Sequence, residues 1–319
     1  KSSGENVSNS DRVRIGIPMP WLQPGAQLSD EARSALTAAT YVGIDFGTST
    51  SVASLVSLDP DTGALCAVPI PLRQFDRLGR EIEHHLVPTC IAWIDETLLI
   101  GTGAAELKTQ LIEGQTIWTS FKMLLGVDLG PQYPSTKLPA SKGAATIERP
   151  RDAARTFFSS LRSGIEEYVR AKGLPPAIRY TVTVPASFES NQRNDLLEAI
   201  TDAGIAPDQC ALLDEPNAAF LSYLIAMEQT SDGSRFIDTL SARPRKVMVF
   251  DFGAGTCDIS ILEVGQNNGL LSSRNLGISR FWALGGDDID RAIAVQALLP
   301  QLCGDEKPET LFGSFKMAK

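Results

Sequence analysis

The chain has 319 residues, enough for two ordinary domains or one large bilobal unit, and its 43% hydrophobic and 21% charged residues are typical of a globular protein. Its formal net charge of −9 disfavours nucleic acid as a ligand, because nucleic-acid binding requires a basic surface. No apolar run is long enough for a membrane span, and the five cysteines are scattered without a CxxC pair, so we expect a cytoplasmic protein with reduced thiols.

The first predicted elements follow a region of different composition. Residues 1–40 are rich in Ser, Pro and Gly, and we interpret them as an appended arm with one short helix beginning near Ser29. Residues 41–58, YVGIDFGTSTSVASLVSL, then predict a strand, a tight turn and a second strand. A turn and a third strand follow, so this part of the chain is expected to form an antiparallel meander.

The middle of the chain alternates between predicted strands and helices. Two short strands are predicted between residues 86 and 100. Residues 151–172 predict one long helix, because apolar residues recur at helical spacing: Phe157, Phe158, Leu161, Ile165 and Val169. A buried strand, IRYTVTV, precedes a second helix from about Ser190 to Ala203. Residues 230–245 are interpreted as a polar linker.

One strand–turn–strand unit occurs twice. The turn DFGTST begins at Asp45, and the turn DFGAGTCD begins at Asp251. Each follows an apolar run, contains a threonine after its glycine, and leads into another apolar strand. The repetition suggests two related halves that face each other across a cleft.

The composition of these turns favours phosphate binding. A tight turn can present backbone N–H groups to an anion only where no side chain blocks the approach, and Thr and Ser hydroxyls add further donors. An acid at the end of the strand can hold hydrated Mg²⁺, because this ion keeps several of its water ligands. Two facing turns would therefore hold a polyphosphate and one metal ion. The alternative is two ordinary hairpins, each with a glycine turn and a capping aspartate.

Five motifs occur in the order found in one known family. They are GIDFGTST from Gly43, KMLLG from Lys122, TVPASFESNQR from Thr183, DEPNAA from Asp214, and DFGAGTCDIS with the later LGGDDID. Over about residues 41–290 the chain resembles the nucleotide-binding domain of the seventy-kilodalton heat-shock (DnaK-type) chaperones, in the actin-like ATPase superfamily.

The resemblance implies an α/β protein with a bilobal actin-like ATPase fold built from duplicated ribonuclease H-like lobes. It divides the chain into an N-terminal extension over 1–40, a first lobe over 41–240 and a second lobe over 241–319. After Arg291 the family continues with a helical subdomain and a Gly-rich adenosine-binding segment, for which this sequence has no counterpart. We therefore expect the second lobe to be incomplete.

The same resemblance implies a site for ATP or ADP with Mg²⁺. The catalytic residues that it implies are Asp45, Lys122, Glu215, Asp251 and Thr256. The nucleotide contacts that it implies are Gly47, Thr48, Ser49, Gly253, Ala254, Gly255, Thr256, Gly285 and Gly286. The metal would be held by Asp45, by Asp251 through water, and by Asp258.

Further roles follow from the resemblance. Lys122 would reach the γ-phosphate, while Glu215 and Asp258 would position the attacking water or the waters of the metal. Pro185 and Arg193 match residues with which the family couples the nucleotide state to its peptide-binding domain.

The chain also departs from the family pattern at three positions near these motifs. Ala254 replaces a glycine of the second turn, Cys257 replaces an aromatic residue, and Ser187 replaces a tyrosine of the coupling segment. The tyrosine replacement weakens the analogy for coupling to a second domain.

The function implied is an ATP-driven conformational switch that acts on a protein client or a co-chaperone. Two alternatives keep the same fold: a scaffold or filament protein that hydrolyses ATP poorly, and a small-molecule kinase, for which no separate catalytic base is evident. A third alternative, from a different functional class, is a non-hydrolysing interaction module that kept the fold and lost the adenosine site. It is favoured by the missing adenosine segment and opposed by the intact Asp45, Lys122, Glu215 and Asp251.

Overall fold

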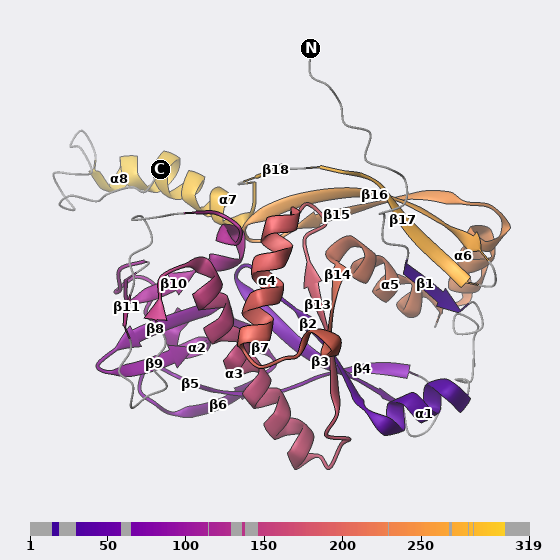
Figure 1. Cartoon of the computed structure of the whole chain (residues 1–319). Coiled ribbons are helices and arrows are strands. Elements are labelled where there is room, and N and C mark those ends of the chain that lie inside the picture. The colour runs from indigo at the N-terminus through magenta and orange to yellow at the C-terminus, as the bar shows by residue number, and fades with distance from the viewer. Residues whose placement is uncertain are drawn as a thin grey trace.

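The structure is a computed structural model, and it is a mixed α/β fold with two large sheets (Figure 1). The described residues are 15–18, 30–58, 65–113, 115–128, 136–137, 146–228, 230–267, 270–279, 281–282 and 284–303. The α/β class expected from the sequence is therefore confirmed. Within the described part, no helix is both long enough and apolar enough to cross a membrane.

The first sheet has the strand order β14-β13-β2-β3-β4, with β7 paired to β3. Its strands are β2 (Thr40–Asp45), β3 (Thr50–Leu58), β4 (Leu65–Pro69), β7 (Leu86–Pro88), β13 (Ile178–Val184) and β14 (Cys210–Asp214). The predicted meander β2–β3–β4 is antiparallel and confirmed, whereas β13 joins β2 in parallel and β14 joins β13 in parallel. The carboxyl ends of β2, β13 and β14 therefore meet at one edge.

Two helices cover this sheet and enclose the main core. The predicted helices are confirmed as α3 (Pro150–Ala171) and α4 (Ser190–Asp202). Phe157 and Phe158 of α3 are fully buried and pack around Phe46, whose ring centroid lies 4.9 Å from that of Phe158. Burial of such large apolar side chains contributes about 1.5–3 kcal/mol each, so α3 fixes the chain immediately after Asp45.

Smaller elements surround this core. They are β5 (Leu72–Phe75), β6 (Glu81–His84), β8 (Cys90–Ile94), β9 (Thr97–Ile100), α2 (Thr102–Ala105), β10 (Ile117–Thr119), the 3₁₀ helix η2 (Phe121–Leu124), β11 (Thr136–Lys137), β12 (Thr146–Ile147) and the 3₁₀ helix η5 (Pro207–Gln209). The region 86–100 holds three strands, β7, β8 and β9, rather than the predicted two. Thr89 divides the first of them from the second.

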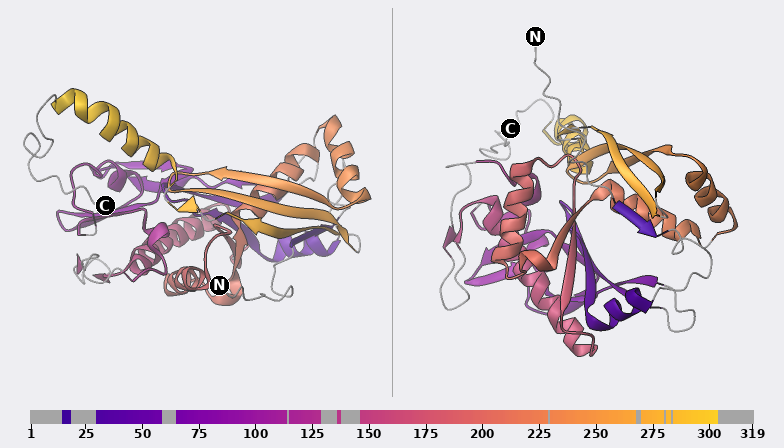
Figure 2. Two further views of the ribbon diagram at one scale, coloured as in Figure 1. Left: turned by 90° about the horizontal axis from the view of Figure 1, so that it is seen from above. Right: turned by 45° about the vertical axis from the view of Figure 1, so that its right-hand side comes forward.

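The second sheet contains the repeated hairpin. It has the order β1-β17-β16-β15, with β18 (Phe281–Trp282) paired to β16. The strands β15 (Arg245–Phe252) and β16 (Thr256–Asn267) form the predicted strand–turn–strand unit, and β17 (Leu270–Ile278) extends it antiparallel. Figure 2 shows this long twisted sheet as a layer beside the first half.

Two helices cover one face of the second sheet. They are α5 (Glu215–Glu228) and α6 (Ser231–Ala242). The prediction of a polar linker over 230–245 is therefore wrong. Thr230 caps α6 by accepting the Gly233 N–H, and Ile237 and Leu240 are buried in a cluster that also contains Leu262 of β16. In the sequence, the polar residues of the outer helical face outnumber these apolar positions, so the segment looks like a linker.

The N-terminal region contributes to both sheets. Helix α1 (Asp30–Ala38) begins next to the predicted Ser29, and it precedes β2 of the first sheet. Strand β1 (Ile15–Pro18), however, pairs antiparallel with β17 of the second sheet. The interpretation of residues 1–40 as a mere appendage is thus wrong for these four residues, because the open edge of β17 offers backbone partners. The rest of that arm lies outside the described residues, except for 30–40.

The two copies of the repeat differ in how their first strands are covered. Ile44, which precedes Asp45, is 1% exposed. Phe250, which precedes Asp251 in the second copy, is 59% exposed, and Met248 is 65% exposed. The last described elements are α7 (Gly286–Ile293), the π-helix η6 (Ala294–Leu298) and α8 (Leu299–Cys303). They do not cover the face of β15 that carries Met248 and Phe250.

The repeat offers a matched pair of substitutions. Ile44→Ala should lower the free energy of unfolding by about 2–5 kcal/mol, because it leaves a cavity in a packed core. Phe250→Ala should change it by less than about 0.5 kcal/mol, because the ring is already in water. Urea titrations of the two variants and the wild type provide the measurement, and equal losses in both variants would contradict the different burial of the two strands.

Candidate functional site

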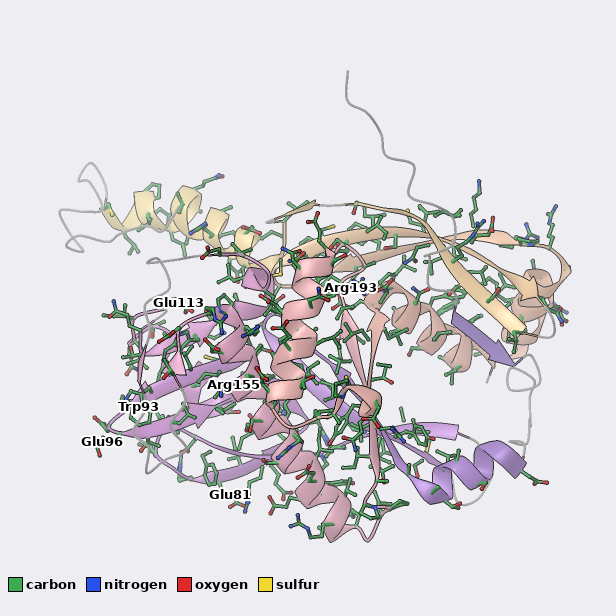
Figure 3. All side chains as sticks on the ribbon, in the orientation of Figure 1. Glu81, Trp93, Glu96, Glu113, Arg155 and Arg193 are labelled. Atoms are coloured by element: carbon green, nitrogen blue, oxygen red, sulfur yellow. The ribbon has the colours of Figure 1, made fainter. Side chains whose placement is uncertain are left out.

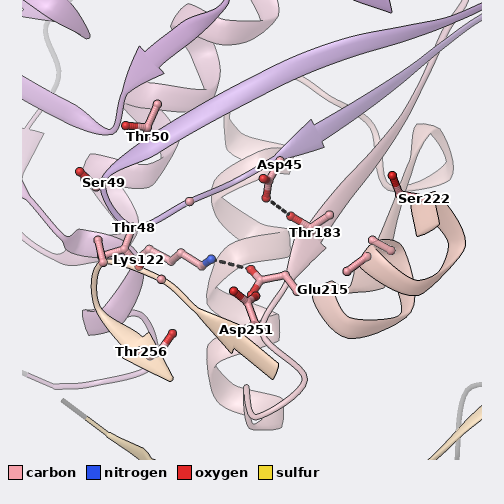
Figure 4. Close-up of a pocket in the computed structure, with 15 residues that line it drawn as sticks. Asp45, Thr48, Ser49, Thr50, Lys122, Thr183, Glu215, Ser222, Asp251 and Thr256 are labelled. Carbon is pink, nitrogen blue, oxygen red and sulfur yellow. Dashed lines mark hydrogen bonds and ion pairs between the residues drawn. The ribbon is translucent and has the colours of Figure 1, made fainter. Parts of the chain in front are cut away.

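A cleft of about 540 Å³ opens between the two repeated turns (Figure 4). Most of the predicted site residues line it: Asp45, Gly47, Thr48, Ser49, Lys122, Glu215, Asp251, Gly253, Ala254 and Thr256. They come from the end of β2 and the β2–β3 turn, η2, the start of α5 and the β15–β16 hairpin, so the fold gathers residues that are far apart in the sequence.

The first turn joins β2 to β3 and is held tightly. A Cβ at Gly47 would lie 2.1 Å from the carbonyl oxygen of Thr50, so only glycine fits there. The Thr89 hydroxyl donates to the Gly47 carbonyl at 2.8 Å, and the Thr89 N–H donates to the Ser49 carbonyl at 2.8 Å. With both carbonyls engaged by Thr89, the turn keeps one shape.

Thr183 fixes the orientation of Asp45. Its hydroxyl donates to Asp45 Oδ1 at 2.8 Å and accepts the Phe46 N–H at 3.3 Å (Figure 4). The contact exists because β13 runs parallel to β2 with Val182 opposite Ile44. Sequence reasoning missed Thr183, since the partner of a parallel strand cannot be read from local pattern.

Further residues missed by sequence reasoning also line the cleft. They are Thr50 beside the first turn and Ala218, Ala219 and Ser222 on α5. Ala218 and Ala219 end the DEPNAA motif and Ser222 follows it, and their helical spacing after Glu215 was the one available signal.

The second turn joins β15 to β16 and is supported from behind. The Gly253 N–H donates to the Thr256 carbonyl at 2.9 Å, and the Gly286 N–H donates to the Gly253 carbonyl at 3.0 Å. A Cβ at Gly285 would lie 2.2 Å from the Ala254 carbonyl oxygen. Gly285 is therefore required for close packing of α7 on the turn, whereas a Cβ at Gly286 would lie 3.7 Å from its nearest neighbouring atom. Neither residue lines the cleft.

The two turns also touch one another. A Cβ at Gly255 would lie 3.0 Å from Thr48 Cγ2, so Gly255 packs against the first turn rather than lining the cleft. This close approach closes one end of the cleft.

Lys122 is buried and forms an ion pair. Ser120 takes a left-handed conformation, with φ of 48°, as the chain enters η2. The Lys122 side chain is 4% exposed, its Nζ donates to Glu215 Oε1 at 2.7 Å, and the ammonium lies 5.6 Å from the centroid of the Phe46 ring. Removal of one partner would leave an uncompensated buried charge, so the pair orders both segments.

The cleft carries more negative than positive charge. Burial raises the pKa of Glu215, against the opposing effect of the Lys122 ammonium. Burial also raises the pKa of Asp251, and the nearby carboxylates of Asp258 and Asp45 raise it further while Lys122 lowers it. These carboxylates would gain stability from a cation placed between them.

Asp258 lies outside the cleft. It is buried and directly opposite Asp251 in the register of β15 and β16. From this position its charge acts on Asp251.

The predicted coupling residues form a separate cluster. Arg193 lies near the end of α4 closest to the second sheet (Figure 3). Its Nη2 donates to Asp214 Oδ1 at 2.7 Å and to the Pro185 carbonyl at 3.3 Å. Asp214 immediately precedes Glu215, so this cluster is covalently adjacent to a residue that lines the cleft.

Comparison with known proteins identifies related chains. A family model described as "Hsp70 protein" matches residues 41–301. Chaperone protein DnaK of Elusimicrobium minutum is 27% identical over 261 residues, which cover 80% of this chain and 34% of the relative. A chaperone protein HscA homolog of Pasteurella multocida is 29% identical over 264 residues, covering 79% and 36%. The DnaK of Methanothermobacter thermautotrophicus is 28% identical over 258 residues, covering 79% and 35%. The chain thus spans about a third of the length of the curated relatives that it matches.

The raised pKa of Asp251 predicts a pH-dependent effect of Asp251→Asn. The folded chain holds this proton more tightly than the unfolded chain, so the stabilising contribution of the protonated acid is present below its ordinary pKa of 3.8 and is lost as the pH rises through the raised pKa. The asparagine variant should therefore gain stability over the wild type as the pH rises above 3.8 and through the raised pKa of Asp251. Urea unfolding across this range measures the gain.

Asp238→Asn, on the exposed side of α6, is the matched control. The stability of that variant should follow the wild type at every pH. A constant difference between Asp251→Asn and the wild type across the range would show that Asp251 is not under electrostatic strain.

Proposed function

The chain belongs to the Hsp70 family, and from this premise we propose that its cleft binds ATP or ADP with Mg²⁺ and hydrolyses ATP. In this proposal the fold is the bilobal actin-like ATPase fold, with lobes over 41–240 and 241–319 and an extension over 1–40. The observation that carries the proposal is that a buried Lys122–Glu215 ion pair shares one cleft with Asp45 and Asp251.

The phosphates would be held by the two turns. Gly47, Thr48 and Ser49 would contact them from one side, and Gly253, Ala254 and Thr256 from the other. Bare backbone and hydroxyl groups suit this role, because both donate hydrogen bonds to phosphate oxygens without adding bulk. Gly255 would act through its contact with the first turn, and Gly285 and Gly286 would act by supporting the second turn from behind.

The residues present fit a divalent cation. Asp45 and Asp251 face the same cleft, and their mutual repulsion contributes to the raised pKa of Asp251. Mg²⁺, when bound, would neutralise phosphate charge between these two acids. Asp258 would act on the metal site through its charge on Asp251, which is its cross-strand partner in the β15–β16 hairpin.

Hydrolysis would depend on the ion pair and on Thr256. The Lys122 ammonium is held by Glu215 in a region sheltered from water, where its charge would stabilise negative charge that develops on the γ-phosphate. The carboxylate of Glu215 would orient the attacking water, and the Thr256 hydroxyl would donate to the transferred group.

We further propose that the nucleotide state controls a protein client or a co-chaperone. The relatives are named as chaperones, and the Arg193 cluster, with Pro185, contacts the residue before Glu215. A reducing, cytoplasmic location is proposed as well, because all five cysteines are free.

Calorimetry with ATP, with and without Mg²⁺, combined with phosphate release, tests this function. The wild type should bind nucleotide with a Mg²⁺-dependent component and release phosphate. Lys122→Ala should reduce turnover by about 100-fold or more, because a preorganised charge at the transferred group is lost. Asp251→Ala should remove the Mg²⁺-dependent component of binding.

Lys172→Ala, on the exposed end of α3, is the control and should behave as the wild type. No binding at about 1 mM nucleotide would reject the proposal and favour a module that acts only through protein contacts. Binding without phosphate release in any variant would favour a non-hydrolysing scaffold.

Thr183 gives a second test of the metal site. Thr183→Val should raise the Mg²⁺ concentration needed for half-maximal turnover by about tenfold, because Asp45 loses a hydrogen bond to its carboxylate. Thr183→Ser keeps the hydroxyl and should restore the wild-type value. If the valine and serine variants required the same Mg²⁺ concentration, the hydroxyl would have no part in orienting Asp45.

A further inference from the structure

The chain that leaves the η2 turn is held by two side chains of α4. The Gly126 N–H donates to Asp195 Oδ2 at 2.8 Å, and the Gly126 carbonyl accepts a hydrogen bond from Asn191 Nδ2 at 2.9 Å. Asn191 and Asp195 are four residues apart and therefore share one face of the helix. Both backbone groups of Gly126 are thus engaged, and this fixes the direction in which the chain leaves η2.

Glycine is required at this contact. Gly126 has a φ of 72°, in the left-handed region that favours glycine. A Cβ at this position would lie 2.8 Å from Gln192 Cγ and 2.9 Å from the Gln192 backbone nitrogen. Gly126 therefore packs directly against the backbone of α4, so a displacement of the helix would displace Gly126 as well.

The held residue is close to Lys122 along the chain. The Leu125 N–H, next to Gly126, donates to the Lys122 carbonyl at 3.3 Å. Leu125 and Phe121 are both fully buried, so apolar side chains hold the η2 turn in the core. Apolar burial is non-directional, however. The directional hydrogen bonds at Gly126 therefore set the orientation of the turn and the path of the Lys122 side chain.

The same helix also holds the chain beside the other member of the ion pair. Arg193 of α4 binds Asp214, the residue before Glu215. One helix thus contacts the chain close to Lys122 and also close to Glu215. Because the pair is joined by one hydrogen bond of 2.7 Å, a small shift of either segment would separate the two charges.

From these contacts we propose that Asp195 and Asn191 are positioning residues for Lys122. Neither lines the cleft. They hold the end of η2 against α4, so that the Lys122 ammonium stays at Glu215 and in place for the γ-phosphate. A charge stabilises a transition state most when it is held in position beforehand. Their effect on hydrolysis rests on the function proposed above, whereas the position of the ammonium can be measured without nucleotide.

Hydrolysis by variants of α4 gives the first test. Asp195→Ala removes the acceptor for the Gly126 N–H, whereas Asp195→Asn keeps an acceptor oxygen. The alanine variant should lower kcat for ATP by about tenfold with little change in KM, because a misplaced Lys122 loses contact only in the transition state. The asparagine variant should recover most of the wild-type kcat. Asn194→Ala, exposed on the same helix, is the control and should match the wild type.

A double-mutant cycle separates positioning from general damage to the site. In the background of Lys122→Ala, the change Asp195→Ala should cause no further loss of kcat, because the group that Asp195 positions is gone. A second loss of about tenfold in that background would mean that the two changes act independently. That result would overturn the proposal.

Acetylation of Lys122 measures the position of its ammonium without nucleotide. An amine that is 4% exposed and ion-paired should react slowly with acetic anhydride, as followed by mass spectrometry of the peptides. The rate should rise at least about tenfold in Asp195→Ala, because the turn opens more often, and should stay near the wild-type rate in Asp195→Asn. Lys172, exposed at the end of α3, should react equally in all variants.

An unchanged rate of Lys122 acetylation in Asp195→Ala would overturn the proposal, whatever the effect on hydrolysis. A wild type that does not hydrolyse ATP would reject the proposed function, while acetylation would still decide the positioning role. If urea titration shows that Asp195→Ala does not fold, Asn191→Ala decides instead, because it removes a hydrogen bond at the exposed end of the same contact. Faster acetylation of Lys122 in that variant supports the proposal, and an unchanged rate overturns it.

Discussion

The buried ion pair between Lys122 and Glu215 is the constraint on which the site depends. A charge that is almost fully removed from water requires an opposite charge at hydrogen-bond distance. The pair therefore fixes η2 relative to the start of α5, two segments that belong to different parts of the chain. Phe46, which lies beside the ammonium, ties the same pair to the end of β2 and to the aromatic core around α3.

Around this pair, the two repeated turns supply opposite walls of one cleft. Each needs glycine where backbone from a neighbouring segment approaches, at Gly47 in the first and at Gly285 behind the second. The acids at the strand ends, Asp45 and Asp251, both line this cleft, and burial raises the pKa of Asp251, with the carboxylates of Asp258 and Asp45 adding to the effect. This arrangement of acids beside bare backbone and hydroxyl groups is the physical basis on which we propose nucleotide and Mg²⁺ binding.

The two halves are unequal beyond the turns. In the first half, the parallel strands β13 and β14 extend the sheet beyond β2, and α3 packs on it. In the second half, β15 is an edge strand with exposed aromatic residues, Phe250 and Phe252, whose rings stack 6.4 Å apart. The opposite edge, β17, is the one that β1 covers. In the described chain, the second sheet is therefore open at β15 both along its edge and on one face.

The sequence by itself determined the local features of this protein. Helical spacing predicted α3 and α4, and turn chemistry predicted the two hairpins. The motifs around Asp45, Lys122 and Asp251 predicted most of the residues that line the cleft. Only the tertiary structure decided that Thr183 orients Asp45, that Asp258 lies opposite Asp251, that 231–242 form a helix and that β1 joins β17. The reason is physical: periodicity and turn preference act between near neighbours, whereas strand register and helix burial depend on partners far along the chain that no local pattern specifies.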